Sequence, residues 1–280
     1  MLLATELTGH RAVLFPEAVA LAYGVWSLRR AAWARPVPLV AVPTACAVLG
    51  LACAWAPGPR WVWTAVALAG AVGLLALTRS PLIPAVSAAV LPVVFGIRDL
   101  EYPLAVLVWC GIPALTVLRV RAAPFPGWPA GRLATFVVAA AAWIAGAGLA
   151  GLPALVVAPP LLVAGLEFVA RGGRVRSWSA LRRGVLMTVA GMLGALALAS
   201  PVPAPLAGAL GVAVLLGLAA LLREPLTPAA ALVLVPFVAG VPDPLLVGGS
   251  FAAGALMLTV LPAALLAAVG AGRRLLGRGA

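Results

Sequence analysis

Eleven apolar runs divide the chain of 280 residues, and the short segments between them hold most of the charged residues. A helix that crosses the hydrocarbon core of a bilayer needs about 17–25 apolar residues. Only 9% of the residues are charged, whereas soluble domains carry about 25%. The sequence therefore predicts an all-α polytopic membrane protein without a separate soluble domain. The expected spans are 12–28, 37–56, 61–78, 81–97, 103–118, 133–151, 153–170, 180–199, 204–222, 225–241 and 245–268.

The distribution of arginine predicts how these spans are oriented. All 19 basic residues are Arg, and the net charge is +12. With the N-terminus outside, sixteen of them fall on the inner side and three, Arg11, Arg60 and Arg98, on the outer side. Cytoplasmic loops carry the excess of basic residues, so we expect the N-terminus outside and the C-terminus inside. The arginines form no patch rich in aromatic residues, which argues against nucleic-acid binding, and the Arg-rich, Ala-rich usage favours a bacterial inner membrane.

One segment of 21 residues occurs twice, as 79–99 and 223–243, with nine identical positions at an offset of 144. Chance would give about three identities. Further matches at this offset begin at Pro16. We therefore expect two repeats of five spans, 1–118 and 153–280, joined by 119–152, which contains the sixth span. Since matching spans are six apart, the repeats are expected to be parallel, and they would be inverted if the sixth span were re-entrant.

Prolines interrupt two expected spans at matching positions. Pro92 and Pro236 each remove one helical hydrogen bond, which frees the carbonyls of Ala88 and Leu232. Broken helices at matching positions of two halves indicate a transport site. We therefore expect a solute path near 81–97 and 225–241, with the two kinks facing one another or a shared central space. Kinks that serve only helix packing are the alternative.

Few polar side chains lie inside the expected spans. Glu17 is about five residues into the first of them, and an intramembrane carboxyl is a candidate functional group by default. Arg11 is near enough in sequence to pair with it instead. Glu167 is expected to form a surface pair with Arg171 at i+4. Hydroxyl side chains either line the path or bond to their own helix backbone, and the candidates are Thr44, Ser87, Thr188 and Thr227.

Two further pairs match at the offset of 144. Asp99 and Asp243 lie at the outer ends of their spans, where they either cap the next helix or bind an ion. Arg79 and Arg223 lie at the inner ends. They either anchor the chain at the interface or attract an anion at a helix start.

The segment 223–236 resembles the signature region of the HPP family of integral membrane proteins, in which a His-Pro-Pro element opens a helix rich in Ala and Leu. The first copy, 81–92, is similar. Neither copy has the His, and the two prolines are separated. The resemblance implies a helical membrane protein. Plant members are associated with nitrite transport, which implies an anionic solute.

The chain shows no recognisable set of base, nucleophile and metal ligands, since it has one His and three Cys. We therefore expect no enzyme activity, no cofactor and no metal. The leading hypothesis is a transporter or channel for a small solute, with an anion favoured by the basic inner side. Its expected partners are the lipid bilayer, the solute, and a second copy or another membrane protein. The alternative, favoured by the scarcity of polar residues in the spans, is a non-catalytic membrane subunit or scaffold that binds a partner protein.

Overall fold

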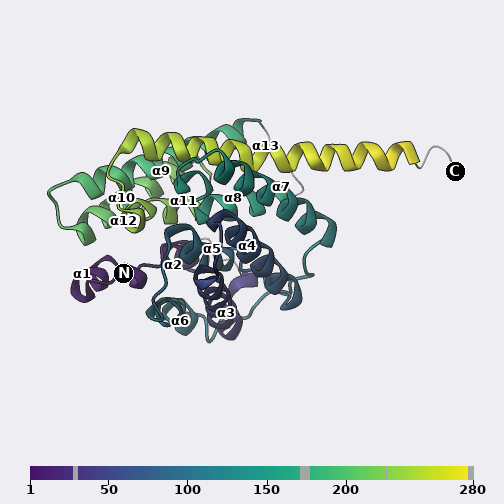
Figure 1. Ribbon diagram of the computed structural model, residues 1–280. Coiled ribbons are helices and arrows are strands. Elements are labelled where there is room, and N and C mark those ends of the chain that lie inside the picture. The colour runs from purple at the N-terminus through teal and green to yellow at the C-terminus, as the bar shows by residue number, and fades with distance from the viewer. Residues whose placement is uncertain (28–30, 171–176, 225, 277–280) are drawn as a thin grey trace.

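The computed structural model describes residues 1–27, 31–170, 177–224 and 226–276, and all regular structure in them is helical. Two groups of helices pack together, one from the first half of the chain and one from the second (Figure 1). The elements are α1 (Leu2–Thr8), η1 (Arg11–Val13), α2 (Glu17–Ala22), η2 (Tyr23–Ser27), η3 (Ala31–Trp33), α3 (Pro36–Trp55), α4 (Arg60–Leu77), α5 (Ala85–Phe95), α6 (Glu101–Thr116), α7 (Ala130–Leu149), η4 (Ala154–Val157), α8 (Pro159–Ala170), α9 (Ser177–Ala199), α10 (Ala204–Leu221), α11 (Thr227–Leu232), α12 (Val235–Ala239) and α13 (Pro244–Leu276).

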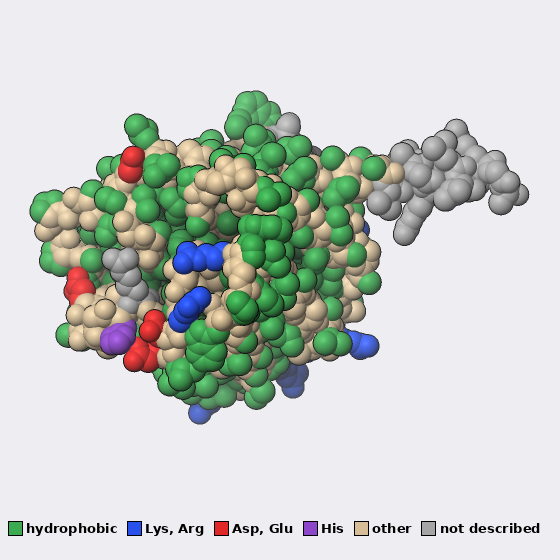
Figure 2. Space-filling view, in the orientation of Figure 1, with side chains coloured by type: hydrophobic (Ala, Val, Ile, Leu, Met, Phe, Trp, Pro, Cys, Tyr) green, Lys and Arg blue, Asp and Glu red, His purple; other side chains and the backbone are tan. Residues whose placement is uncertain are grey.

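Six helices in the described part of the chain are long and apolar enough to cross a membrane. Each coincides with an expected span, and large apolar side chains such as Leu77 and Leu221 are exposed on them. Figure 2 shows one face of the molecule, on which hydrophobic side chains are widespread and charged side chains are few. This exterior is suited to lipid, because a soluble protein rarely exposes apolar patches of this extent. The six helices are α3, α4, α7, α9, α10 and α13.

The expectation of eleven full spans is wrong for the described residues. The other five apolar segments form short or interrupted helices, such as α5, which is 11 residues long. Eleven helical residues extend about 16 Å, roughly half of a hydrocarbon core of about 30 Å. The cause is local. The segment before Ala85 contains Pro81 and Pro84, and Gly96 ends the helix in the left-handed conformation with φ of 69°.

These short elements form the core of the protein. Every residue is buried in the stretches 80–94, 155–169 and 226–238. The first helix of each half packs on the interrupted helix of the other, α2 on α11 and α5 on α8. Pro92 lies on α5 and Pro236 on α12, and these two helices are not a main packing pair among the described residues. That the two proline-broken segments border a shared central space stays a prediction.

Several local features recur at the offset of 144. Both bounds of α4 and α10 differ by this number. Arg79 and Arg223 have φ of 46° and 52°, and they are the non-glycine residues with positive φ in the part of the chain that is described. Gly50 on α3 lies against the carbonyl of Ala89, and Gly194 on α9 lies against the carbonyl of Val233. The two halves therefore share turn conformations and close helix contacts.

The left-handed conformation of Arg79 gives a testable expectation. A residue with a Cβ atom loses about 1 kcal/mol in this conformation, and glycine does not. We expect the free energy of unfolding of Arg79→Gly to exceed that of Arg79→Ala by about 1 kcal/mol. Thermal unfolding in detergent measures the difference, with a thiol-reactive fluorophore reporting exposure of the buried cysteines Cys46, Cys53 and Cys110. Equal stabilities of the two variants would show that backbone conformation is not limiting at this position.

Candidate functional site

Glu17, the first residue of α2, is 1% exposed. Neither of its carboxyl oxygens has a hydrogen-bond partner among the described residues, and the buried hydroxyl of Ser87 on α5 has none either. The Ser87 hydroxyl lies close to the Glu17 carboxyl, but the two groups do not meet the geometry of a hydrogen bond. The side chain of Arg11 is outside the described residues, so its expected pairing with Glu17 stays a prediction. A carboxylate buried without a partner is costly, so this group calls for a proton or an external ligand.

The buried side chain of Tyr102 on α6 lies near Glu17 and is hydrogen-bonded to the proline-broken helix. The Tyr102 hydroxyl donates a hydrogen bond of 3.0 Å to the carbonyl of Ala88, which is the carbonyl that Pro92 leaves without a helical donor. Buried carbonyls are paired in nearly all proteins. The carbonyl expected to be open to a solute is therefore already satisfied by the protein.

In the second half, the Thr227 hydroxyl donates a hydrogen bond of 2.9 Å to Oε1 of Glu167. Glu167 is 2% exposed, which overturns its expected place on the surface, and Arg171 lies outside the described residues. Pro236 is in the first turn of α12, which begins after the helix stops at residues 233–234. It therefore starts a new helix, where no amide hydrogen is needed, and does not kink a continuous one.

Two of the remaining sequence-predicted residues bond to their own helix backbones. The hydroxyls of Thr44 and Thr188 donate to their own helices, to Val40 at 2.8 Å and Gly184 at 2.9 Å. These bonds agree with the alternative in which the two hydroxyls bond to their own helix backbone and do not line a path. Thr188 also borders a cavity of about 580 Å³ between α8, α9 and α13.

Asp243 caps α13, because its Oδ1 accepts hydrogen bonds from the amides of Leu245 at 2.9 Å and Leu246 at 3.1 Å. Asp99 is exposed and precedes α6, where its backbone carbonyl accepts the amide of Tyr102. Arg79 and Arg223 are both exposed. None of these four residues reaches the buried carboxyl of Glu17 through a contact in the described structure.

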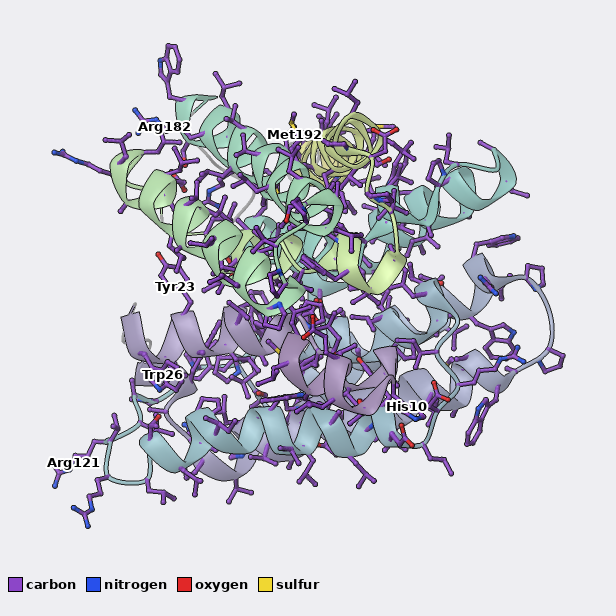
Figure 3. All side chains as sticks on the ribbon, turned by 90° about the vertical axis from the view of Figure 1, so that its left-hand side faces the viewer. His10, Tyr23, Trp26, Arg121, Arg182 and Met192 are labelled. Carbon is purple, nitrogen blue, oxygen red and sulfur yellow. The ribbon has the colours of Figure 1, made fainter. Side chains whose placement is uncertain are left out.

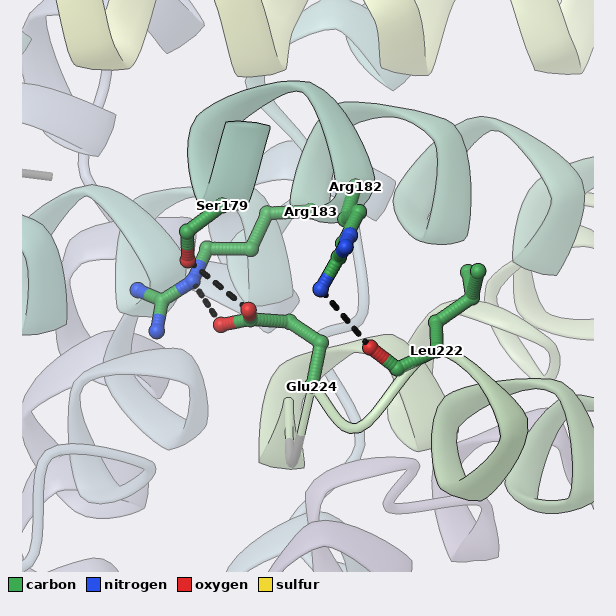
Figure 4. Close-up of polar contacts among 5 residues, drawn as sticks. All are labelled: Ser179, Arg182, Arg183, Leu222 and Glu224. Atoms are coloured by element: carbon green, nitrogen blue, oxygen red, sulfur yellow. Dashed lines mark hydrogen bonds and ion pairs between the residues drawn. The ribbon is translucent and has the colours of Figure 1, made fainter. Parts of the chain in front are cut away.

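Sequence reasoning missed a buried ion pair at the start of α9. Glu224 accepts a hydrogen bond from the Ser179 hydroxyl at 2.8 Å and forms an ion pair with Arg183 (Figure 4). Neighbouring Arg182 donates to the carbonyl of Leu222 at 3.2 Å. Comparison of the two copies contains a signal for this pair. At the offset of 144, Arg183 matches Leu39 and Glu224 matches Ser80, so both charged residues are present in the second copy and both are absent from the first.

A second ion pair is exposed. Nδ1 of His10 lies 3.0 Å from Glu101, and both side chains are 52% exposed. Figure 3 shows Arg121 and Arg182 projecting from the same side of the molecule, away from His10. A basic residue of the connecting segment 119–152 and one of the second half are therefore present on one side of the molecule.

No group of three or more His, Cys, Asp and Glu residues could hold a metal ion within the part of the chain that is described. No family model, curated protein or solved structure matches the chain. The most unusual chemical feature of the described core is that the Glu17 carboxyl and the Ser87 hydroxyl are both buried without a hydrogen-bond partner.

Proposed function

We propose that the chain is a membrane transporter for a small solute, seen here in a closed state, and that Glu17 takes part in transport. The observation that carries the proposal is the fully buried Glu17 carboxyl without a hydrogen-bond partner among the described residues. Such a group destabilises the packed core and supports no described contact, so a functional role explains its presence better than a structural one.

The position of Glu17 suits a group that couples solute movement to an ion. It lies on α2, which packs on α11 of the other half. A movement of one half against the other would therefore change the surroundings of the carboxyl. A proton is the favoured coupling ion, because hard metal cations take six or more oxygen ligands. Ser87, a polar side chain close to the carboxyl, adds only one oxygen.

We further propose that 1–118 and 153–280 are parallel repeats, that the N-terminus is outside, and that the protein resides in a bacterial inner membrane. The recurring helix bounds and the left-handed Arg79 and Arg223 support a duplication. The presence of Arg121 and Arg182 on one side supports an inner face that carries the basic residues (Figure 3). The anionic class of solute and the resemblance to the HPP family stay predictions.

Flux into liposomes tests this function. The purified protein is reconstituted with a trapped pH-sensitive dye, and inward gradients of small anions and neutral solutes are applied in turn. We expect the wild type to move at least one solute together with protons, and Glu17→Gln to lose at least tenfold in rate. Glu6→Gln, which changes an exposed acid on α1, is the matched control and should keep the rate. A Glu17→Gln variant as fast as the wild type for every solute moved would contradict the proposal.

A scaffold that binds a partner protein is the second candidate. The dense burial of 80–94 and 226–238 favours it, as does the internal bond between Tyr102 and Ala88. This alternative predicts no flux of any solute by the wild type. It also predicts that Glu17→Gln leaves partner capture unchanged, which separates it from transport.

A further inference from the structure

A cavity of about 580 Å³ lies between α8, α9 and α13. It follows α9 from Ala180 to Val189, a distance of about 13 Å at the rise of a helix. Its walls are mainly apolar and include Phe168, Met187 and Leu258. An elongated, mainly apolar space fits a hydrocarbon chain better than a compact polar solute.

One charged side chain, an arginine that is ion-paired with Glu224, lines the cavity towards the start of α9. This residue is Arg183, and its side chain is 12% exposed. Its Nε is bonded to Glu224, and Figure 4 shows the two terminal nitrogens directed away from that carboxylate. A guanidinium held on one edge still presents two N–H donors in a fork that matches a phosphate or carboxylate. Arg182, the preceding residue, is exposed and lies beside the cavity without lining it.

The rim of the cavity faces the surface that is suited to lipid. Leu181 and Val185 on α9 and Leu256 on α13 line it and are exposed. Both helices are candidate membrane spans. Trp178, near the start of α9, is also exposed, and Trp is enriched at the level of lipid headgroups. An occupant would therefore enter from the bilayer, with its chain along α9 and its polar group at Arg183.

We propose that this cavity binds one acyl chain of an anionic phospholipid, with the lipid phosphate at the terminal nitrogens of Arg183. The apolar walls select the chain, and the two arginines favour an anionic headgroup over a zwitterionic one. This site is separate from Glu17, and the proposal does not depend on transport.

Gly184 offers a direct test, because a Cβ atom added there meets nothing within 4 Å while the residue lines the cavity. The full chain is placed in nanodiscs of equal phosphatidylglycerol and phosphatidylcholine, and retained lipid is measured by native mass spectrometry after mild delipidation. We expect the wild type to retain phosphatidylglycerol at least fivefold over phosphatidylcholine. Gly184→Leu, which fills the cavity, should lose at least tenfold in retained phosphatidylglycerol.

Two variants keep the test falsifiable. Gly184→Ala adds one methyl group and should retain most of the lipid. Gly217→Leu on α10 also places its side chain in open space, outside the cavity, and should match the wild type. Equal retention by Gly184→Leu and the wild type would overturn the proposal. Absence of a headgroup preference, or an equal loss in Gly217→Leu, would overturn it as well.

Discussion

Gly50→Ala and Gly194→Ala are each expected to lower the free energy of unfolding by about 3 kcal/mol. A Cβ atom at Gly50 would overlap the carbonyl of Ala89, and one at Gly194 would overlap the carbonyl of Val233. Both carbonyls belong to backbone segments that are buried at every residue, so they cannot retreat without disturbing the core. Unfolding in mixed detergent, followed by the reactivity of the buried cysteines, measures the loss.

Gly73→Ala and Gly217→Ala are the matched controls. These glycines are also 144 residues apart and lie within α4 and α10, but an added Cβ atom would meet nothing within 4 Å. Because alanine favours a helix over glycine, we expect their stability to stay unchanged or to rise by up to about 1 kcal/mol. Equal losses in all four variants would show that overlap with the carbonyls of Ala89 and Val233 does not cause the loss of stability.

Glu224→Ala is expected to lower the free energy of unfolding by about 3 kcal/mol, because it leaves the guanidinium of Arg183 buried without its counter-charge. The two side chains are only 12% and 9% exposed. Glu101→Ala provides the comparison, since it breaks the half-exposed pair with His10. Exposed ion pairs contribute less than about 1 kcal/mol. The same unfolding measurement should therefore separate the two variants clearly.

A double variant tests whether the ion pair causes this loss. The matching positions of the first half hold Leu39 in place of Arg183 and Ser80 in place of Glu224. The double variant Arg183→Leu with Glu224→Ser should therefore recover most of the stability lost in Glu224→Ala, because no charge is then left buried. A double variant that loses as much as the two single changes together would exclude the pair as the cause.

The six long helices could be predicted from the sequence, and the five short ones could not be told from full spans. A continuous apolar run indicates burial, but it does not distinguish lipid from protein as the surrounding medium. The run 81–97 is as apolar as a span, yet the structure buries it among other helices. The packing of α3, α4 and α8 around α5 shows that this segment belongs to the interior.

Glu17 could be identified as a candidate because it is an acid within an apolar run, whereas its surroundings could not. Ser87 and Tyr102 come from α5 and α6, and their approach depends on how those helices pack. The spacing of Glu167 and Arg171 at i+4 predicts a pair on the surface, which differs from the buried position of Glu167. Its described partner Thr227 is 60 residues away, a contact that no local pattern reveals.

The packing of α2 on α11 has a consequence for synthesis of the chain. Glu17 begins α2 and Thr227 begins α11, so 210 residues separate them. At a translation rate of about 5–20 residues per second, the ribosome needs roughly 10–40 s between the two. During that interval the carboxyl of Glu17 has left the ribosome without its final covering. A nascent chain that stops before α11 therefore leaves the face of α2 that packs on α11 uncovered.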